Sequence, residues 1–189
     1  MKLLKQFLKK IRYVDRYIRF YHKFNSFGKH SVIKKPFRLI NMHNVDVGDY
    51  CLFMPGLRLE TIEHTNWNNQ KFTPHITFGD HVEVQQGVHI VATHNIKIGN
   101  NVGIGPYSMI NDTRHVYTDP DTPIMYQPLD GGNIEIGDGS MLGMGACVLP
   151  GVKIGKNCFI GANCVVAKDV PDNTIVSPAK NRKATIPVD

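Results

Sequence analysis

The chain has 189 residues, of which 42% are hydrophobic and 20% are charged. This composition is typical of a globular domain rather than a disordered chain, and no apolar run approaches the roughly 20 residues that a membrane-spanning helix requires. The four cysteines show neither a CxxC pair nor zinc-finger spacing, and no secretory signal precedes them, so we expect free thiols in a reducing, cytoplasmic compartment.

The net charge of +6 is unevenly distributed. Residues 1–38 hold 12 of the 22 Lys and Arg residues but one of the 16 Asp and Glu residues, so the rest of the chain is net acidic. A nucleic-acid-binding domain usually spreads its basic residues over a folded face. We therefore expect no nucleic-acid partner.

Residues 1–38 are predicted to form a basic helical N-terminal segment. Within 2–24 the apolar residues recur at helical spacing with Lys and Arg between them. Such an amphipathic helix is suited to peripheral contact with an anionic membrane, here at its inner face. It is equally suited to capping the open end of a repeat domain. The sequence leaves both interpretations open.

From residue 47 onward, an aliphatic or aromatic residue recurs every six positions. The series contains Val47, Phe53, Leu59, Phe78, Val84, Ile90, Ile98, Ile104, Ile110, Ile136, Leu142, Val148, Ile154, Ile160 and Val166. A period of six fits neither an α-helix nor a simple two-sided strand, but it fits a short strand followed by a corner. Three such units make a triangular coil of 18 residues whose repeat residues point inward, so we predict an all-β domain over 39–189.

Breaks in the phase locate insertions. About 13 extra residues lie around 61–75, two lie near 94, and 20 lie within 112–133. A solenoid accepts insertions at its corners, and such loops often form the binding face. We therefore predict that 112–133 is an active-site loop.

The stretch 136–166 repeats the pattern Ile-Gly-x-x-small-x and resembles the hexapeptide-repeat acyltransferases, in the branch that O-acetylates sugars and polysaccharides. The resemblance implies a left-handed parallel β-helix that assembles as a homotrimer with active sites between subunits. It also implies transfer of an acyl group, expected to be acetyl, from a coenzyme A thioester to a sugar or a cell-surface polysaccharide precursor. The family's reaction uses no metal.

Deprotonation of an acceptor hydroxyl requires a base, and histidine suits this role near neutral pH. His115 begins the long loop within an Asp-x-x-His segment similar to that of the O-acetylating branch, so we expect it to be the general base. Asp112 is a candidate for orienting the imidazole, as are another loop carboxylate and a backbone carbonyl; alternatively, Asp112 caps a turn.

The resemblance also implies a donor site. The pantetheine arm is expected against the backbone of Gly143, Gly145, Ala146, Gly161 and Ala162, with the Gly143 N–H as a candidate donor to the thioester oxygen. The phosphates are expected to meet Lys168, Lys180, Arg182 and Lys183. For the acceptor, Tyr107 and Tyr117 are candidate stacking residues, and Gln85 and Asn111 are candidate hydroxyl-binding residues.

Two alternative functions remain. His89 and His94 have the H-x4-H spacing of β-helix zinc carbonic anhydrases, with His64 as a possible third ligand. The other alternative is a structural solenoid without catalytic activity, although such a protein needs neither the long loop nor the basic tail.

Overall fold

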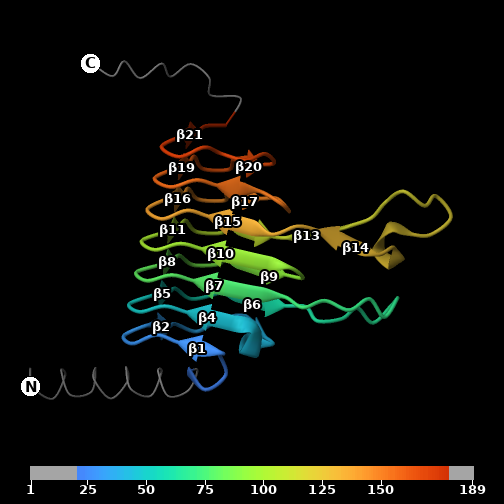
Figure 1. Ribbon diagram of the computed structural model, residues 1–189, viewed down its shortest axis with the longest axis horizontal. Helices are drawn as coiled ribbons and strands as arrows, with labels where there is room; N and C mark the ends of the chain where they lie inside the picture. Colours follow the sequence, from blue (N-terminus) through green and yellow to red (C-terminus); the bar gives the residue numbers. More distant parts are fainter. Residues whose placement is uncertain (1–20, 179–189) are drawn as a thin grey trace, which may run out of the picture.

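Short parallel strands stack in three sheets, one on each face of a triangular prism (Figure 1). The computed structural model describes residues 21–178 and has the left-handed parallel β-helix architecture that the repeat predicts. Face A contains β1 (Ser26–Phe27), β4 (Val45–Val47), β7 (His75–Phe78), β10 (Asn95–Ile98), β15 (Ile134–Ile136) and β18 (Lys153–Ile154). Face B contains β2 (Val32–Ile33), β5 (Leu52–Phe53), β8 (Glu83–Val84), β11 (Gly103–Ile104), β16 (Met141–Leu142), β19 (Phe159–Ile160) and β21 (Ile175–Val176). Face C contains β3 (Arg38–Ile40), β6 (Arg58–Thr61), β9 (His89–Ala92), β12 (Met109–Asn111), β17 (Cys147–Val148) and β20 (Val165–Val166).

The chain passes from face A to B to C and back, and each circuit is one coil. Coil 1 is β1–β3, coil 2 is β4–β6, coil 3 is β7–β9, coil 4 is β10–β12, coil 5 is β15–β17 and coil 6 is β18–β20. We name the corners after the faces that they join: A–B, B–C and C–A.

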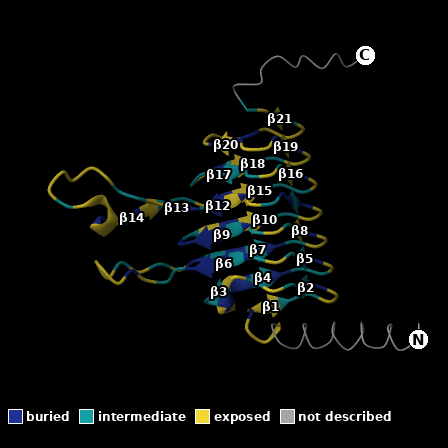
Figure 2. Cartoon of the chain, turned by 180° about the vertical axis from the view of Figure 1, so that it is seen from behind, coloured by how far each residue is buried: buried dark blue, intermediate teal, exposed yellow. Residues whose placement is uncertain are grey.

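The repeat residues form the core, as predicted. Parallel pairing aligns them from coil to coil, so that Phe78 lies beside Ile98, and Ile98 beside Ile136. Every member of the repeat series is at most 3% exposed, and Figure 2 shows the buried residues following the stacked strands. Burial of these aliphatic columns supplies the main stabilisation of the fold.

Glycine follows many of the repeat residues because stacked coils approach closely at that point. A Cβ on Gly105 would lie 2.7 Å from the backbone carbon of Gly143, and a Cβ on Gly143 would lie 2.7 Å from the backbone nitrogen of Ala162. Backbone contacts at that distance leave no room for a side chain. The requirement is therefore steric, and the position of each glycine is fixed by the coil stacked on it.

The β-helix begins earlier than predicted, and the boundary at residue 38 is corrected accordingly. Coil 1 occupies residues 26–40, and all but its last two residues lie in the segment 1–38 that the sequence assigned to a basic helical segment. Phe27, Ile33 and Leu39 already follow the period of six, but they lie among lysines and arginines, so charge concealed the repeat. The predicted helix over 2–24 lies almost wholly outside the described residues.

All the insertions leave from the C–A corner. The 3-10 turn η1 (Met42–Asn44), the segment 62–74, the slip at 93–94 and the loop 112–133 each connect a strand of face C to the next strand of face A. Figure 1 shows the two long insertions projecting on the same side of the prism. Over residues 21–178, no helix has the length and apolar character needed to cross a membrane.

Candidate functional site

The long insertion is an ordered hairpin. Strand β13 (Thr113–His115) pairs antiparallel with β14 (Leu129–Gly131), and the Val116 N–H extends the ladder to the Pro128 carbonyl at 2.8 Å. Beyond it lies the 3-10 turn η2 (Ile124–Tyr126). The buried Gln127 side chain closes the tip, because its Nε2 donates to the carbonyls of Asp119 at 2.8 Å and Thr122 at 2.7 Å. The loop therefore presents its side chains from a defined scaffold.

The short insertion contacts the base of this hairpin. Gln70 Nε2 donates to the Leu129 carbonyl at 2.7 Å, and Gln70 Oε1 accepts the Leu129 N–H at 2.8 Å. Trp67 Nε1 points to the Gln127 carbonyl at 3.4 Å. Two insertions that are far apart in sequence thus form one structure at the C–A corner. The sequence placed both insertions at corners but gave no sign of these contacts.

His115 lies where the two insertions meet. It is the cross-strand partner of Leu129, and its ring stacks on Trp67 with 5.9 Å between ring centroids and 25° between planes. The ring is half-buried, and its Nδ1 atom is buried without a hydrogen-bond partner among residues 21–178. Its orientation is therefore set by packing and not by a hydrogen bond at Nδ1.

Asp112 is fully buried and does not reach His115. Its Oδ1 accepts the Thr93 N–H at 2.7 Å and its Oδ2 accepts the His94 N–H at 2.9 Å, so both oxygens hold the corner of the coil before. Burial raises the pKa of this carboxyl, while the hydrogen bonds from Thr93 and His94 oppose the shift. These hydrogen bonds match the turn-capping role that the sequence left open for Asp112. They include no contact with His115 that would support the orienting role.

The predicted pantetheine residues lie at a different corner. Gly143, Gly145 and Ala146 follow β16, and Gly161 and Ala162 follow β19, so they stack along the B–C corner of coils 5 and 6. Beside them, on face B, is a groove of about 560 Å³ whose lining includes Gly143, Met144 and the predicted acceptor residue Gln85. The structure thus brings together residues that the sequence had assigned to donor and acceptor.

The free backbone donors at this corner differ from the expected one. The Gly143 N–H already donates to the Ile160 carbonyl at 2.7 Å, as the stacking of coils requires. In contrast, within the described chain the N–H groups of Met144 and Ala162 take part in no hydrogen bond. Met144 was not among the predicted site residues. Its N–H and that of Ala162 are the free donors beside Gly143.

The remaining candidates are dispersed. Tyr107 lies at the B–C corner with its ring over Gly87 and is largely exposed. Asn111 ends β12 at the C–A corner, where its Oδ1 accepts the Thr113 N–H at 3.3 Å, and Tyr117 is exposed on the hairpin. Lys168 is exposed at the C–A corner and is therefore separated from the glycine column by face C. The other three predicted phosphate partners, Lys180, Arg182 and Lys183, lie outside the described residues.

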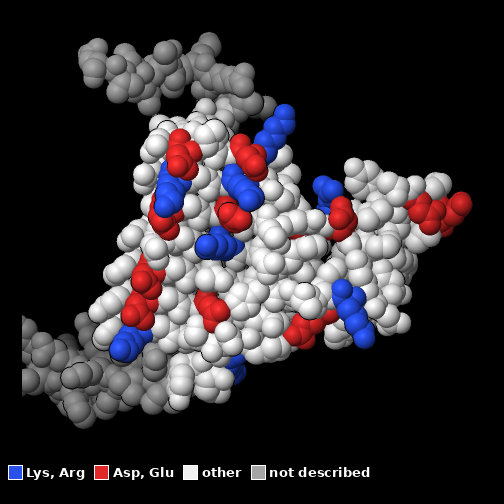
Figure 3. Space-filling model, viewed as in Figure 1, with Lys and Arg blue, Asp and Glu red and all other residues white. Residues whose placement is uncertain are grey.

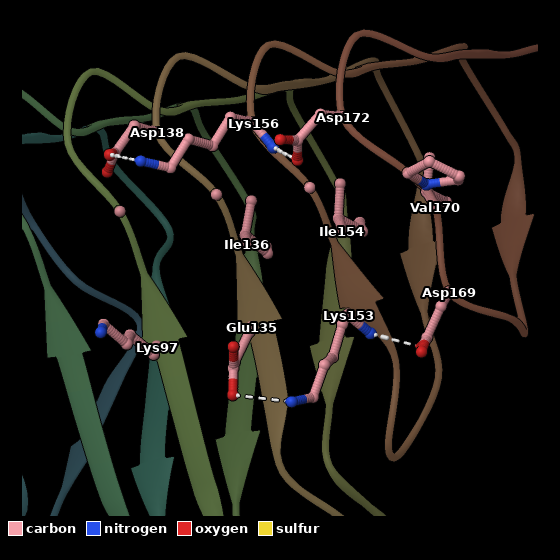
Figure 4. A pocket seen from close by; sticks show the side chains of 14 residues that line it. Lys97, Glu135, Ile136, Asp138, Lys153, Ile154, Lys156, Asp169, Val170 and Asp172 are labelled. Carbon is pink, nitrogen blue, oxygen red and sulfur yellow. Dashed lines mark hydrogen bonds and ion pairs between the residues drawn. The ribbon is translucent and has the colours of Figure 1, made fainter.

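Several basic side chains on face A form ion pairs with neighbouring carboxylates. Figure 3 shows basic and acidic side chains interleaved over this side of the molecule. A hollow of about 510 Å³ on this face is lined by Lys153, which pairs with Glu135 at 3.3 Å, and by Lys156, which pairs with Asp138 at 3.2 Å (Figure 4). Paired surface charges of this kind are solvated and contribute little to binding or stability. Of the basic side chains that line this hollow, Lys153 and Lys156 are therefore engaged by carboxylates.

The residues of the zinc hypothesis do not converge. In the described part of one chain, no three His, Cys, Asp or Glu side chains gather as a metal site requires, so His64, His89 and His94 form no ligand set. His94 instead shares a hydrogen bond of 2.9 Å between its Nδ1 and the Thr93 hydroxyl.

The cysteines have no visible role in the site. Cys51, Cys158 and Cys164 occupy inward positions and are buried, and Cys147 is half-buried.

Comparison with known proteins agrees with the six-residue repeat and the β-helix fold. Residues 133–168 match the family described as bacterial transferase hexapeptide (six repeats). The chain is 29% identical over 158 residues to the putative lipopolysaccharide biosynthesis O-acetyl transferase WbbJ of Escherichia coli, which covers 79% of this chain and 76% of that protein. It is 30% identical over 132 residues to the galactoside O-acetyltransferase of Lactococcus lactis, but spans only 57% of the length of that relative and 69% of its own.

Among solved structures, the N-acyltransferase AntD from Bacillus cereus, in complex with dTDP and 3-hydroxybutyryl-CoA, superposes with a TM-score of 0.66. The alignment covers 90% of this chain and 81% of AntD at 17% identity, so it supports the fold alone. The six-residue repeat, the corner insertions and the sequence relatives agree: residues 133–168 carry the hexapeptide repeat of the bacterial transferases, and the chain as a whole is similar to O-acetyltransferases.

Proposed function

We propose that this protein is an O-acetyltransferase that moves an acetyl group from acetyl-CoA to a hydroxyl of a sugar or of a cell-surface polysaccharide precursor. The observation that carries the proposal is the placement of His115, held by two interlocked insertions at the edge of the β-helix. The names of the two sequence relatives support a sugar acceptor. They also favour oxygen over nitrogen as the acceptor atom.

His115 would act as general base through Nε2, because Nδ1 is buried. The imidazole takes the proton from the acceptor hydroxyl while the hydroxyl oxygen attacks the thioester carbonyl carbon. The tetrahedral intermediate then collapses, the carbon–sulfur bond breaks, and the proton passes from the imidazolium to the leaving thiolate. Acetyl ester and coenzyme A result, and no acyl-enzyme forms. Such a positioned base typically accelerates a reaction by about 10²–10⁴-fold.

The acetyl-CoA donor would lie along the B–C corner, in the groove beside Gly143. Small residues there leave the backbone accessible, which suits a narrow pantetheine arm. The N–H groups of Met144 and Ala162 have no other partner in the described chain and would stabilise the negative charge that develops on the thioester oxygen. Removing one such donor typically costs about 10²–10³-fold in kcat.

One protomer cannot complete this site, because face C separates the His115 corner from the Gly143 corner. We therefore propose a homotrimer in which the hairpin of one subunit meets the B–C corner of its neighbour. The outward side chains support this arrangement. Faces B and C expose the apolar residues Met141, Phe159, Ile175 and Val165, at 44–69% of their surface, whereas the corresponding residues of face A in coils 4–6 are charged. Exposed apolar rows of this kind typically mark an interface.

The test is an acceptor screen with purified protein. Acetyl-CoA is mixed with a panel of mono- and oligosaccharides, release of the coenzyme A thiol is followed, and the product is identified by the mass of one added acetyl group. We expect thiol release that depends on a hydroxylated acceptor. Release with amino sugars alone, after which the product carries an N-acetyl group, would contradict O-transfer. No release with any acceptor would favour the structural solenoid.

A further inference from the structure

The short insertion, 62–74, has no obvious role in a β-helix. It is itself well ordered: Thr65 is buried and its N–H donates to the Gln70 carbonyl at 3.0 Å, and the Phe72 N–H donates to the Glu63 carbonyl at 2.8 Å. The Thr65 hydroxyl also contacts Asn68 and accepts the Gln70 N–H at 3.1 Å. A small, internally bonded hairpin therefore presents residues 67–70 toward the base of the long one.

Gln70 supports the long hairpin as a third strand would. Its carboxamide satisfies both the N–H and the carbonyl of Leu129, at 2.8 and 2.7 Å. These groups face away from β13, and Leu129 pairs with His115 on its other side. The order of contacts is therefore Gln70, Leu129, His115. Displacement of the carboxamide would release the strand that carries the partner of His115.

Trp67 contacts the imidazole of His115 directly. The indole stacks on the His115 ring, and its Nε1 reaches the Gln127 carbonyl at the end of the tip. In most sites of this type a carboxylate or carbonyl bonded to the second ring nitrogen orients a catalytic imidazole. Here the carboxylate nearest in sequence, Asp112, is occupied by Thr93 and His94, and Nδ1 of His115 has no partner in the described chain.

We propose that Trp67 and Gln70 are positioning residues for His115: the stacked indole and the braced hairpin do the work usually done by a hydrogen-bonded carboxylate. The inference rests on the proposed role of His115 as base. It assigns the short insertion to the active site of the same chain. Because misplacing a catalytic group by about 1 Å can cost on the order of 10²-fold, the brace is expected to matter for kcat rather than for donor binding.

Trp67 is the only tryptophan in the chain, so its fluorescence reports this contact without labelling. A protonated imidazole quenches a stacked indole. Emission of the wild-type protein should therefore fall when the pH is lowered enough to protonate the imidazole. The step should vanish in His115→Gln and persist in His64→Gln, the matched change at a histidine of the short insertion. A step that survives His115→Gln would overturn the contact, whether or not the protein has activity.

The kinetic arm uses Gln70→Leu, which keeps the size of the side chain and removes both hydrogen bonds. We expect kcat to fall about 10- to 100-fold, with the KM for acetyl-CoA unchanged and the fluorescence step diminished. Trp67→Leu should behave alike, and Trp67→Phe, which keeps an aromatic face, should recover most of the rate. Asn66→Ala, an exposed neighbour, is the control and should match the wild type.

The outcomes separate the two proposals. If Gln70→Leu and Trp67→Leu are as active as wild type, the positioning role is refuted while the proposed function stands. A rise in acceptor KM at constant kcat also refutes it, because it would make Trp67 a binding surface for the acceptor. If wild type transfers nothing, the proposed function fails, and an unchanged fluorescence step in Gln70→Leu would then reject the brace independently.

Discussion

The carboxylate of Asp112 accepts the backbone N–H of His94 at 2.9 Å, so a side chain of coil 4 closes the corner of coil 3. The second oxygen holds the Thr93 N–H. Asn at this position has one acceptor oxygen, and its amide group would face one of the two N–H donors. Asp112→Asn should therefore cost about 1–3 kcal/mol, or roughly 2–4 °C in Tm per kcal/mol. Calorimetry checks this, with Asp121→Asn at the exposed loop tip as the neutral control.

The same carboxyl gives a pH dependence whose sign follows from its surroundings. Burial raises its folded-state pKa above the ordinary value of 3.8, so the folded state binds the proton more tightly than the unfolded state. The contribution is complete below that value and declines as pH rises through the raised pKa. The stability advantage of wild type over Asp112→Asn should thus shrink as pH rises above 3.8 and through the raised pKa. An advantage that grows over this range would contradict the raised pKa.

The packing of glycines between coils predicts a contrast between two neighbouring positions. A Cβ on Gly105 would meet the Gly143 backbone at 2.7 Å, whereas a Cβ on Gly103 would approach only the Met141 side chain, at 3.6 Å. Gly105→Ala should therefore destabilise the protein by about 1–3 kcal/mol, and Gly103→Ala should be close to neutral. Urea unfolding of both variants measures the difference. Equal effects would show that backbone approach is not the reason for glycine.

Much of the fold could be read from periodicity, because each core residue depends on neighbours six positions away. The same arithmetic located all three insertions beyond residue 47. It failed at coil 1, where Phe27 and Ile33 carry the repeat inside a basic stretch whose charge suggested a helix. Here the local charge pattern concealed a signal that the period alone would have supplied.

The site was less predictable than the fold. Its contacts join residues from separate insertions, and their distance in the sequence follows no repeat. Trp67 meets His115 because two insertions leave the same corner on either side of coil 3. Nothing in either segment identifies the other as its partner. The engagement of the Gly143 N–H, in contrast, was foreseeable. Its equivalents Gly105 and Gly161 donate to the next coil in the same way, so the free donors had to lie one residue further on.

The apolar rows of faces B and C predict a trimer that one charge can disrupt. Phe159 is 44% exposed on face B, and a carboxylate there would be desolvated on assembly. Phe159→Glu should therefore elute as a monomer in size-exclusion chromatography with light scattering. Lys97→Ala, on the charged face A, should remain trimeric. A wild-type monomer, or a trimer unaffected by Phe159→Glu, would contradict the assignment of faces.

His115 gives the most direct test of the chemistry. His115→Ala removes the base but leaves the Gly143 corner intact, so kcat should fall by about 10²–10⁴-fold while acetyl-CoA affinity is retained. The acid limb of the wild-type profile of kcat/KM against pH, where a protonated imidazole cannot accept a proton, should disappear with it. His64→Gln, in the short insertion, serves as the control and should keep both the rate and the acid limb. Because substitution could disturb the hairpin, the variant is first shown to be trimeric and to melt as wild type does. A folded His115→Ala trimer with an undiminished rate would remove His115 from the mechanism and leave the free N–H groups of Met144 and Ala162 as the remaining catalytic elements.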